Sequence, residues 1–144
     1  MVKNTQNSAV NAKNDMQMGG FLNTRSKQLC NLLRPMNFKI DGWIGTINDV
    51  DSTSDGKGVL SIKVGKDIFI ETWNNAFSDF VAKTLIEPNS SVFNAAANMS
   101  KGDKVKFSGN FVIHDTHCID EQSISLSGKV REPEFTFKFV EIAK

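Results

Sequence analysis

Two aromatic and two basic side chains between residues 63 and 73 have the chemistry of a binding surface. Phe69 and Trp73 can stack on nucleobases, which contributes about 1–3 kcal/mol per base. Lys63 and Lys66 can contact phosphate groups. The alternation of side chains along a strand puts both rings on the face opposite an aliphatic set. The rings form a site if this face is exposed; alternatively, they pack under an N-terminal helix or a helical insert.

Two asparagines, Asn74 and Asn75, follow Trp73 directly. Their side-chain amides offer both donors and acceptors, so they could read base edges or a peptide backbone. The alternative is a turn in which the amides bond their own backbone.

Two groups of residues resemble metal sites incompletely. Asp51, Thr53, Asp55 and Gly56 match positions 1, 3, 5 and 6 of a calcium loop, but Ile62 stands where a bidentate Glu is needed. A second group, H-x-x-H-C, contains the residues His114, His117 and Cys118. Zinc needs a fourth ligand, which only the distant Cys30 could supply. We therefore predict no metal site and no cofactor.

Catalytic motifs are missing from the sequence. It contains no P-loop, no G-x-S-x-G and no H-E-x-x-H. The two histidines, His114 and His117, lie in one predicted loop, which leaves few general bases that titrate near neutrality. The sequence favours a non-enzymatic protein, with a small carboxylate-dependent hydrolase as a remote alternative.

The two cysteines, Cys30 and Cys118, are far apart in the chain. In a reducing compartment they are two buried thiols, and in an oxidising one they are a candidate disulfide. Two cysteines do not decide between these cases.

Alternating apolar residues predict a mainly β chain. The expected strands are 38–50, 58–64, 68–73, 104–113 and 134–142, with an additional short strand at 123–126. Gly42 and Gly45 interrupt the first strand, as in the bent strand of a small barrel. The aliphatic residues of the second and third strands share one face only if Val64 opposes Ile68, which requires a three-residue loop.

Helices are expected before the strand pattern and inside it. Residues 1–22 are polar and predict a disordered basic arm, and a short helix follows from residue 23 to Pro35. Residues 78–86 and 90–99 predict a helical insert between the third and fourth strands, each segment with a capping serine. We therefore expect one domain over residues 23–144.

The stretch KGDKVKFSGNF, residues 101–111, resembles the entry to the fourth strand of small bacterial OB domains. The chain from Asp41 to Ile142 is similar to uncharacterised bacterial OB-fold domains of the tRNA-anticodon-binding-like type, through DGWIGTI, DGKGVLSIKV, TWNN and PEFTFKF. The resemblance implies a five-stranded Greek-key barrel with a helical insert between strands three and four. It also implies a binding module whose ligand lies on the outer face of the second and third strands, where Phe69 and Trp73 fall.

The charge distribution bears on the choice of ligand. The net charge is only +1, which disfavours a dedicated nucleic-acid binder, but residues 1–39 carry six basic residues against Asp15 alone. We slightly favour single-stranded nucleic acid as the ligand. The alternative is a protein partner within a bacterial assembly or envelope. No oligomeric state follows from these patterns.

The chain contains no apolar run long enough to span a membrane and begins with no apolar leader. As it stands we expect a cytoplasmic protein. A leader preceding this sequence would instead make it periplasmic or membrane-tethered.

Overall fold

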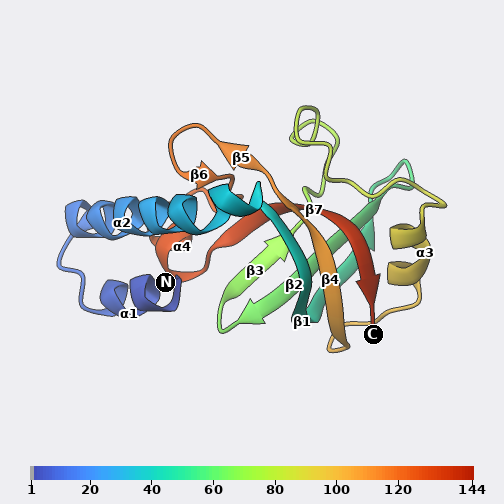
Figure 1. Cartoon of the computed structure of the whole chain (residues 1–144), viewed down its shortest axis with the longest axis horizontal. Helices are drawn as coiled ribbons and strands as arrows, with labels where there is room; N and C mark the ends of the chain where they lie inside the picture. The colour runs from blue at the N-terminus through green and yellow to red at the C-terminus, as the bar shows by residue number, and fades with distance from the viewer. Residues whose placement is uncertain (1) are drawn as a thin grey trace.

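A computed structural model of the chain describes residues 2–144. Five strands close a barrel in the order β1-β2-β3-β7-β4 (Figure 1). Strands β3 and β7 pair in parallel, and the other neighbours are antiparallel. This confirms the predicted mainly β fold with a closed five-stranded barrel. The strands are β1 (Lys39–Ser52), β2 (Gly58–Gly65), β3 (Ile68–Glu71), β4 (Lys104–Phe111) and β7 (Glu134–Ala143).

Alternate residues of these strands fill the barrel, and aromatic rings occupy much of it. Phe107, Phe137 and Phe139 contact one another edge to face. Such T-shaped pairs add about 0.5–1.5 kcal/mol to the energy of burial alone. Gly109 permits close approach of β4 to β7, because a Cβ there would lie 2.1 Å from the carbonyl oxygen of Lys138. Gly42, with φ +68°, lies where the β1–β4 register shifts, so the predicted bend of the first strand is observed.

The hairpin of β2 and β3 keeps the predicted register but not the predicted loop. Ile62 opposes Ile70 and Lys63 opposes Phe69, as the aliphatic alternation requires. Val64 does not oppose Ile68, because the register shifts there and Gly65 takes that position. A bulge at this end, followed by a two-residue turn, therefore replaces the three-residue loop.

Helices at residues 2–10 and 15–33 differ from the disordered arm predicted for residues 1–22; residue 1 lies outside the described part of the chain. Helix α1 (Val2–Val10) and helix α2 (Asp15–Leu33) pack with α4 (Leu126–Arg131) beside the barrel (Figure 1). The side chain of Asn14 caps α2 by accepting from the backbone N–H of Gln17. A few apolar residues suffice to order this segment because they form a small second core: Ala9, Met18, Leu22 and Val130.

Helix α4 also corrects the extra strand predicted at residues 123–126. Ser125 caps this helix by accepting from the backbone N–H of Gly128. Two short strands lie earlier than expected, β5 (Ile113–His114) and β6 (Cys118–Ile119), and they form a separate two-stranded sheet. The 3-10 helix η1 (Arg34–Met36) follows α2 at Pro35, where the sequence predicted that the helix would end.

The insert between the third and fourth barrel strands contains one helix rather than two. Helix α3 (Ser91–Ala97) begins after its capping residue Ser90, as predicted. Residues 78–82 form turns and residues 83–85 are irregular, which corrects the helix predicted at 78–86. Ile86 instead pairs with Gly58, so the chain crosses the start of β2 before it enters α3.

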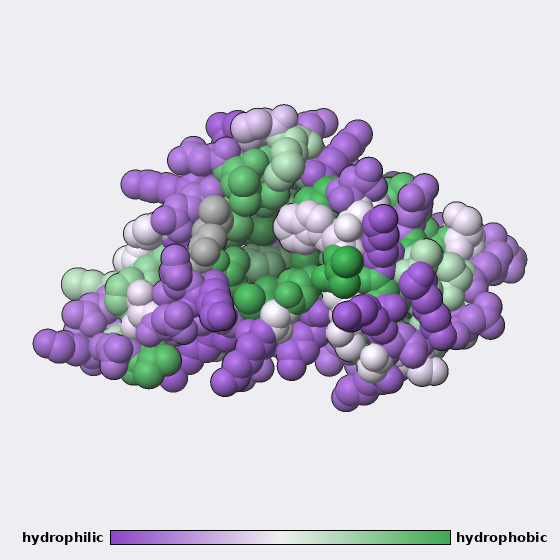
Figure 2. Space-filling model, turned by 60° about the horizontal axis from the view of Figure 1, so that its bottom comes forward, coloured by the Kyte–Doolittle hydropathy of each residue, from purple (hydrophilic) through white to green (hydrophobic). Residues whose placement is uncertain are grey.

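The molecular surface is apolar in places. Figure 2 shows apolar residues gathered around a hollow in the middle of one face, with polar residues around it. Within residues 2–144, no helix has the length and hydropathy needed to cross a bilayer.

Candidate binding face of strands β2 and β3

The two aromatic residues predicted to bind ligand are partly exposed. Phe69 lies in β3 opposite Lys63, and Trp73 follows the strand end at Glu71. Both rings are half-buried, while Lys63 and Lys66 are exposed. The face therefore presents parts of two rings, with a lysine directly across from one of them.

A polar network crosses this face. The side-chain amide of Asn48 in β1 donates to Ser61 Oγ at 3.2 Å, and Ser61 Oγ donates to Glu71 at 2.8 Å. Burial raises the pKa of Glu71 to about 7. The hydrogen bond from Ser61 opposes this shift, and the charges of Glu134 and Asp49 make lesser contributions in the same direction as burial. Near neutral pH, Glu71 can therefore be either a hydrogen-bond donor or an anion.

The asparagines that follow Trp73 make bonds with their neighbours. Asn75 accepts from the backbone N–H of Ser78 at 2.7 Å and donates to the side chain of Asn74 at 2.9 Å. This is the local turn that the sequence allowed as an alternative. Both side chains remain exposed.

The loop at 51–57 also bonds to itself. Thr53 donates through its hydroxyl to Asp55, and the backbone N–H of Thr53 donates to Lys57 at 2.9 Å. Gly56 has φ +88°, a conformation that favours glycine. These contacts make a tight turn between β1 and β2 from the residues that partly match a calcium loop.

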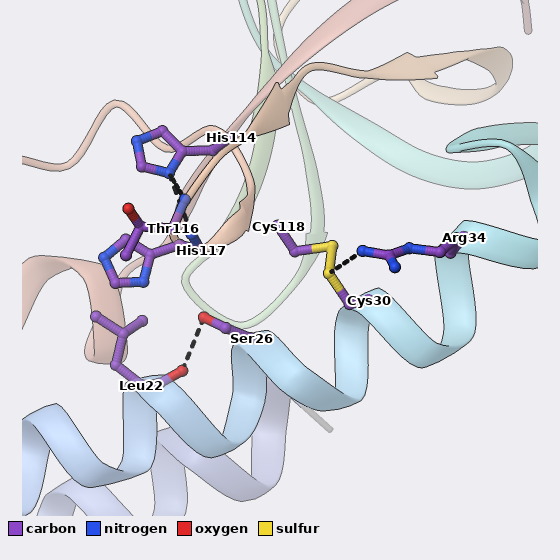
Figure 3. The surroundings of a disulfide bond; sticks show 8 residues. All are labelled: Leu22, Ser26, Cys30, Arg34, His114, Thr116, His117 and Cys118. Atoms are coloured by element: carbon purple, nitrogen blue, oxygen red, sulfur yellow. Dashed lines mark hydrogen bonds between the residues drawn. A yellow bond between two sulfur atoms is a disulfide. The ribbon is translucent and has the colours of Figure 1, made fainter.

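The histidines stack on each other in the β5–β6 turn. The ring centroids of His114 and His117 are 5.5 Å apart, and His114 Nδ1 accepts from the backbone N–H groups of Thr116 and His117 (Figure 3). Burial and the neighbouring His114 lower the pKa of His117. The sulfur of Cys118 is bonded to another cysteine and is not a thiolate ligand.

Cys30 of α2 and Cys118 of β6 form a disulfide, the pair for which the sequence made them candidates. Their Cα atoms are 5.6 Å apart (Figure 3). The bond links the long N-terminal helix to the small β5–β6 sheet. Arg34, four residues further along the chain and the first residue of η1, donates to Cys30 Sγ at 3.8 Å.

The sequence missed a second exposed feature, the loop between β3 and α3. Phe77, Phe80 and Val81 are 94%, 81% and 87% exposed, although the helix predicted here would have placed Phe80 and Val81 on an apolar face. We call these three residues the apolar loop tip. In Figure 1 the loop stands away from the barrel.

Asp79 holds this loop in place from beneath. It is 7% exposed and accepts from the backbone N–H and hydroxyl of Thr84 and from the backbone N–H of Leu85. Thr84 Oγ1 also accepts from the backbone N–H of Trp73 at 2.9 Å, which ties the loop to the end of β3. An acid four residues after a turn asparagine, between two Phe, was the only sequence signal for this arrangement.

Comparisons with models of protein families, with curated proteins and with solved structures found no match to this chain.

Proposed function

We propose that the chain is a non-enzymatic, OB-type binding module for single-stranded nucleic acid, with its ligand on the outer face of β2 and β3. One observation carries this proposal. Two partly exposed aromatic residues, Phe69 and Trp73, lie on either side of Glu71 in the chain, and the carboxylate of Glu71 accepts a hydrogen bond from Ser61.

Aromatic rings on an open strand face suit unpaired bases. A base of any sequence has a flat π-face, so stacking on Phe69 or Trp73 requires no particular sequence. Bases in a duplex are already stacked on each other, so the ligand must be single-stranded. Lys63 lies across from Phe69, so its ammonium group would bind the phosphate of a nucleotide whose base stacks on that ring.

The network between the rings suits the polar edges of bases. Asn48 and Ser61 supply donors and acceptors, and Glu71 is a donor when it is protonated. Its pKa of about 7 leaves both forms populated at neutral pH.

The acids of this face limit the electrostatic contribution to binding. The charges of Asp49 and Glu134 contribute to the raised pKa of Glu71, although less than burial does, and they also oppose a phosphate chain on the same face. Binding should therefore be modest and depend more on stacking than on counterion release. It should strengthen as the pH falls through 7, because protonation removes the charge of Glu71.

Titration with fluorescent oligonucleotides tests the proposal. The full chain should bind single-stranded DNA or RNA at low salt and prefer it to a duplex of the same sequence. Phe69→Ala should weaken binding by about 1–3 kcal/mol. Lys63→Gln should weaken it and flatten the salt dependence, whereas Lys101→Gln, at an exposed lysine of the turn before β4, should change little.

Absence of binding to any single strand at low salt would show that the proposal is wrong. Equal effects of Lys63→Gln and Lys101→Gln would show that the contact is unspecific and that the ligand face lies elsewhere.

A further inference from the structure

Among residues 2–144, the apolar loop tip is the most exposed group of large apolar side chains close together in sequence. Phe77, Phe80 and Val81 fall within five residues, and each is more than four-fifths exposed. Exposed apolar groups of this kind mark contacts with proteins or membranes. The buried Asp79 also holds the loop through three hydrogen bonds, two from the backbone N–H groups of Thr84 and Leu85 and one from the Thr84 hydroxyl.

Positive charge lies behind this tip. Lys57, Lys83 and Lys138 line the same cavity as Phe80, on the barrel side of the loop. Lys57 pairs with Glu87 at 3.4 Å, while Lys83 and Lys138 have no carboxylate within ion-pair distance in residues 2–144. Between residues 74 and 86 the single acid, Asp79, is buried, so the exposed charge of this segment is that of Lys83. The next acid along the loop, Glu87, is exposed, lines the same cavity and pairs with Lys57.

We propose that the apolar loop tip inserts into the surface of an anionic lipid bilayer, with Lys83 and Lys138 against the headgroups. Shape and charge favour lipid over a protein partner. A protruding tip with apolar ends and lysines behind matches the layered chemistry of a bilayer surface, apolar inside and anionic outside. This site lies outside the β2–β3 face and does not depend on nucleic-acid binding.

Flotation with lipid vesicles tests this inference. The full chain should bind vesicles of phosphatidylcholine mixed with phosphatidylglycerol and bind pure phosphatidylcholine vesicles much more weakly. The double variant Phe77→Ser/Phe80→Ser should lose about tenfold or more in affinity, since it lacks the two rings that become buried when the tip inserts into the bilayer. Ile124→Ser is the matched control, because Ile124 is equally exposed in another loop, and it should bind like the wild type.

Substitution of a lysine provides a second, independent test of membrane binding. Lys83→Gln should weaken binding to anionic vesicles about fivefold, the effect of one basic residue near a charged bilayer. It should leave binding to neutral vesicles unchanged. All substituted residues are exposed, so circular dichroism melting should show folded variants.

Three results would overturn the proposal. One is no binding to either vesicle. Another is equal binding by the double variant and the wild type. The third is self-association of the wild type that depends on Phe77 and Phe80 in the absence of vesicle binding, which would make the tip a protein contact. Oligonucleotide binding is measured separately and is expected to survive in the Phe77→Ser/Phe80→Ser variant.

Discussion

Arg25 and Glu121 form an ion pair in which the two side chains are only 2% and 4% exposed. Arg25 also donates to the carbonyl oxygen of Lys129 at 2.6 Å, and its guanidinium lies 5.2 Å from the centre of the Phe135 ring. A single side chain of α2 therefore contacts the segment after β6, helix α4 and barrel strand β7. Burial lowers the pKa of Arg25 and raises that of Glu121, and the attraction between them opposes both shifts.

Removing one member of this pair should destabilise the protein strongly. Arg25→Met leaves the Glu121 carboxylate buried without its partner, which typically costs about 3–5 kcal/mol. The double variant Arg25→Met/Glu121→Leu should recover much of this loss, because no charge remains buried. Urea unfolding of the two single variants and the double variant measures the coupling. Additive effects would contradict the interpretation.

Glu71 should make stability depend on pH. Burial raises its pKa in the folded state from 4.5 to about 7, so the folded protein holds this proton more tightly than the unfolded chain. The contribution to stability is complete below pH 4.5 and is lost as the pH rises to about 7. Between pH 5 and pH 8, Glu71→Gln should gain roughly 1–2 kcal/mol relative to the wild type, after discounting for partial solvent contact.

Urea titrations at the two pH values measure this difference. Glu141→Gln, at an exposed position of β7, is the control and should follow the wild type at both values. A constant difference between Glu71→Gln and the wild type would show that Glu71 does not titrate in this range.

The disulfide should stabilise the fold substantially. Cys30 and Cys118 are separated by 88 residues, and the chain-entropy model gives about 4–5 kcal/mol for a closed loop of this size. The variant Cys30→Ala/Cys118→Ala should unfold at clearly lower urea concentration than the oxidised wild type. Added reductant should lower the wild-type midpoint and leave that of the variant unchanged; a shift in both would indicate an effect unrelated to this bond.

Asp79 should keep the β3–α3 loop in a single ordered conformation. Asp79→Ala leaves the donors of Thr84 and Leu85 without their acceptor, which costs about 1–3 kcal/mol. Limited proteolysis should then cut the chain between residues 76 and 83 faster than in the wild type. The control Asp55→Ala changes an exposed acid in another loop and should leave cleavage in this region unaltered.

The features predicted well from the sequence depend on local periodicity. Leu60, Ile62 and Ile70 point into the barrel because alternate residues of a strand face one side. The same reasoning failed for residues 78–86, where apolar spacing matched a helix. There the carboxylate of Asp79 offers the backbone a different set of hydrogen bonds, and turns result.

Contacts between segments far apart in the chain could not be predicted from the sequence. The N-terminal helices are ordered by residues such as Ala9 and Met18 packing on Val130, more than 100 positions away. Arg25 and Glu121 are 96 residues apart, and the sequence around each residue contains no pattern that predicts its partner. The raised pKa of Glu71 also could not be predicted, because it depends first on burial in the folded barrel and then on the charges of Glu134 and Asp49 from two other strands.

The disulfide makes a covalent ring of the chain from Cys30 to Cys118, and this ring encloses four of the five barrel strands. A single cut in the loops at 51–57 or 74–86 would leave one molecule on a gel without reductant and two fragments with it. Strand β7 alone lies outside the ring. It completes the barrel by pairing with β3 on one side and β4 on the other. The disulfide therefore links the part of the chain that forms an open four-stranded sheet. Closure of the barrel depends on the non-covalent pairing of β7 with β3 and β4.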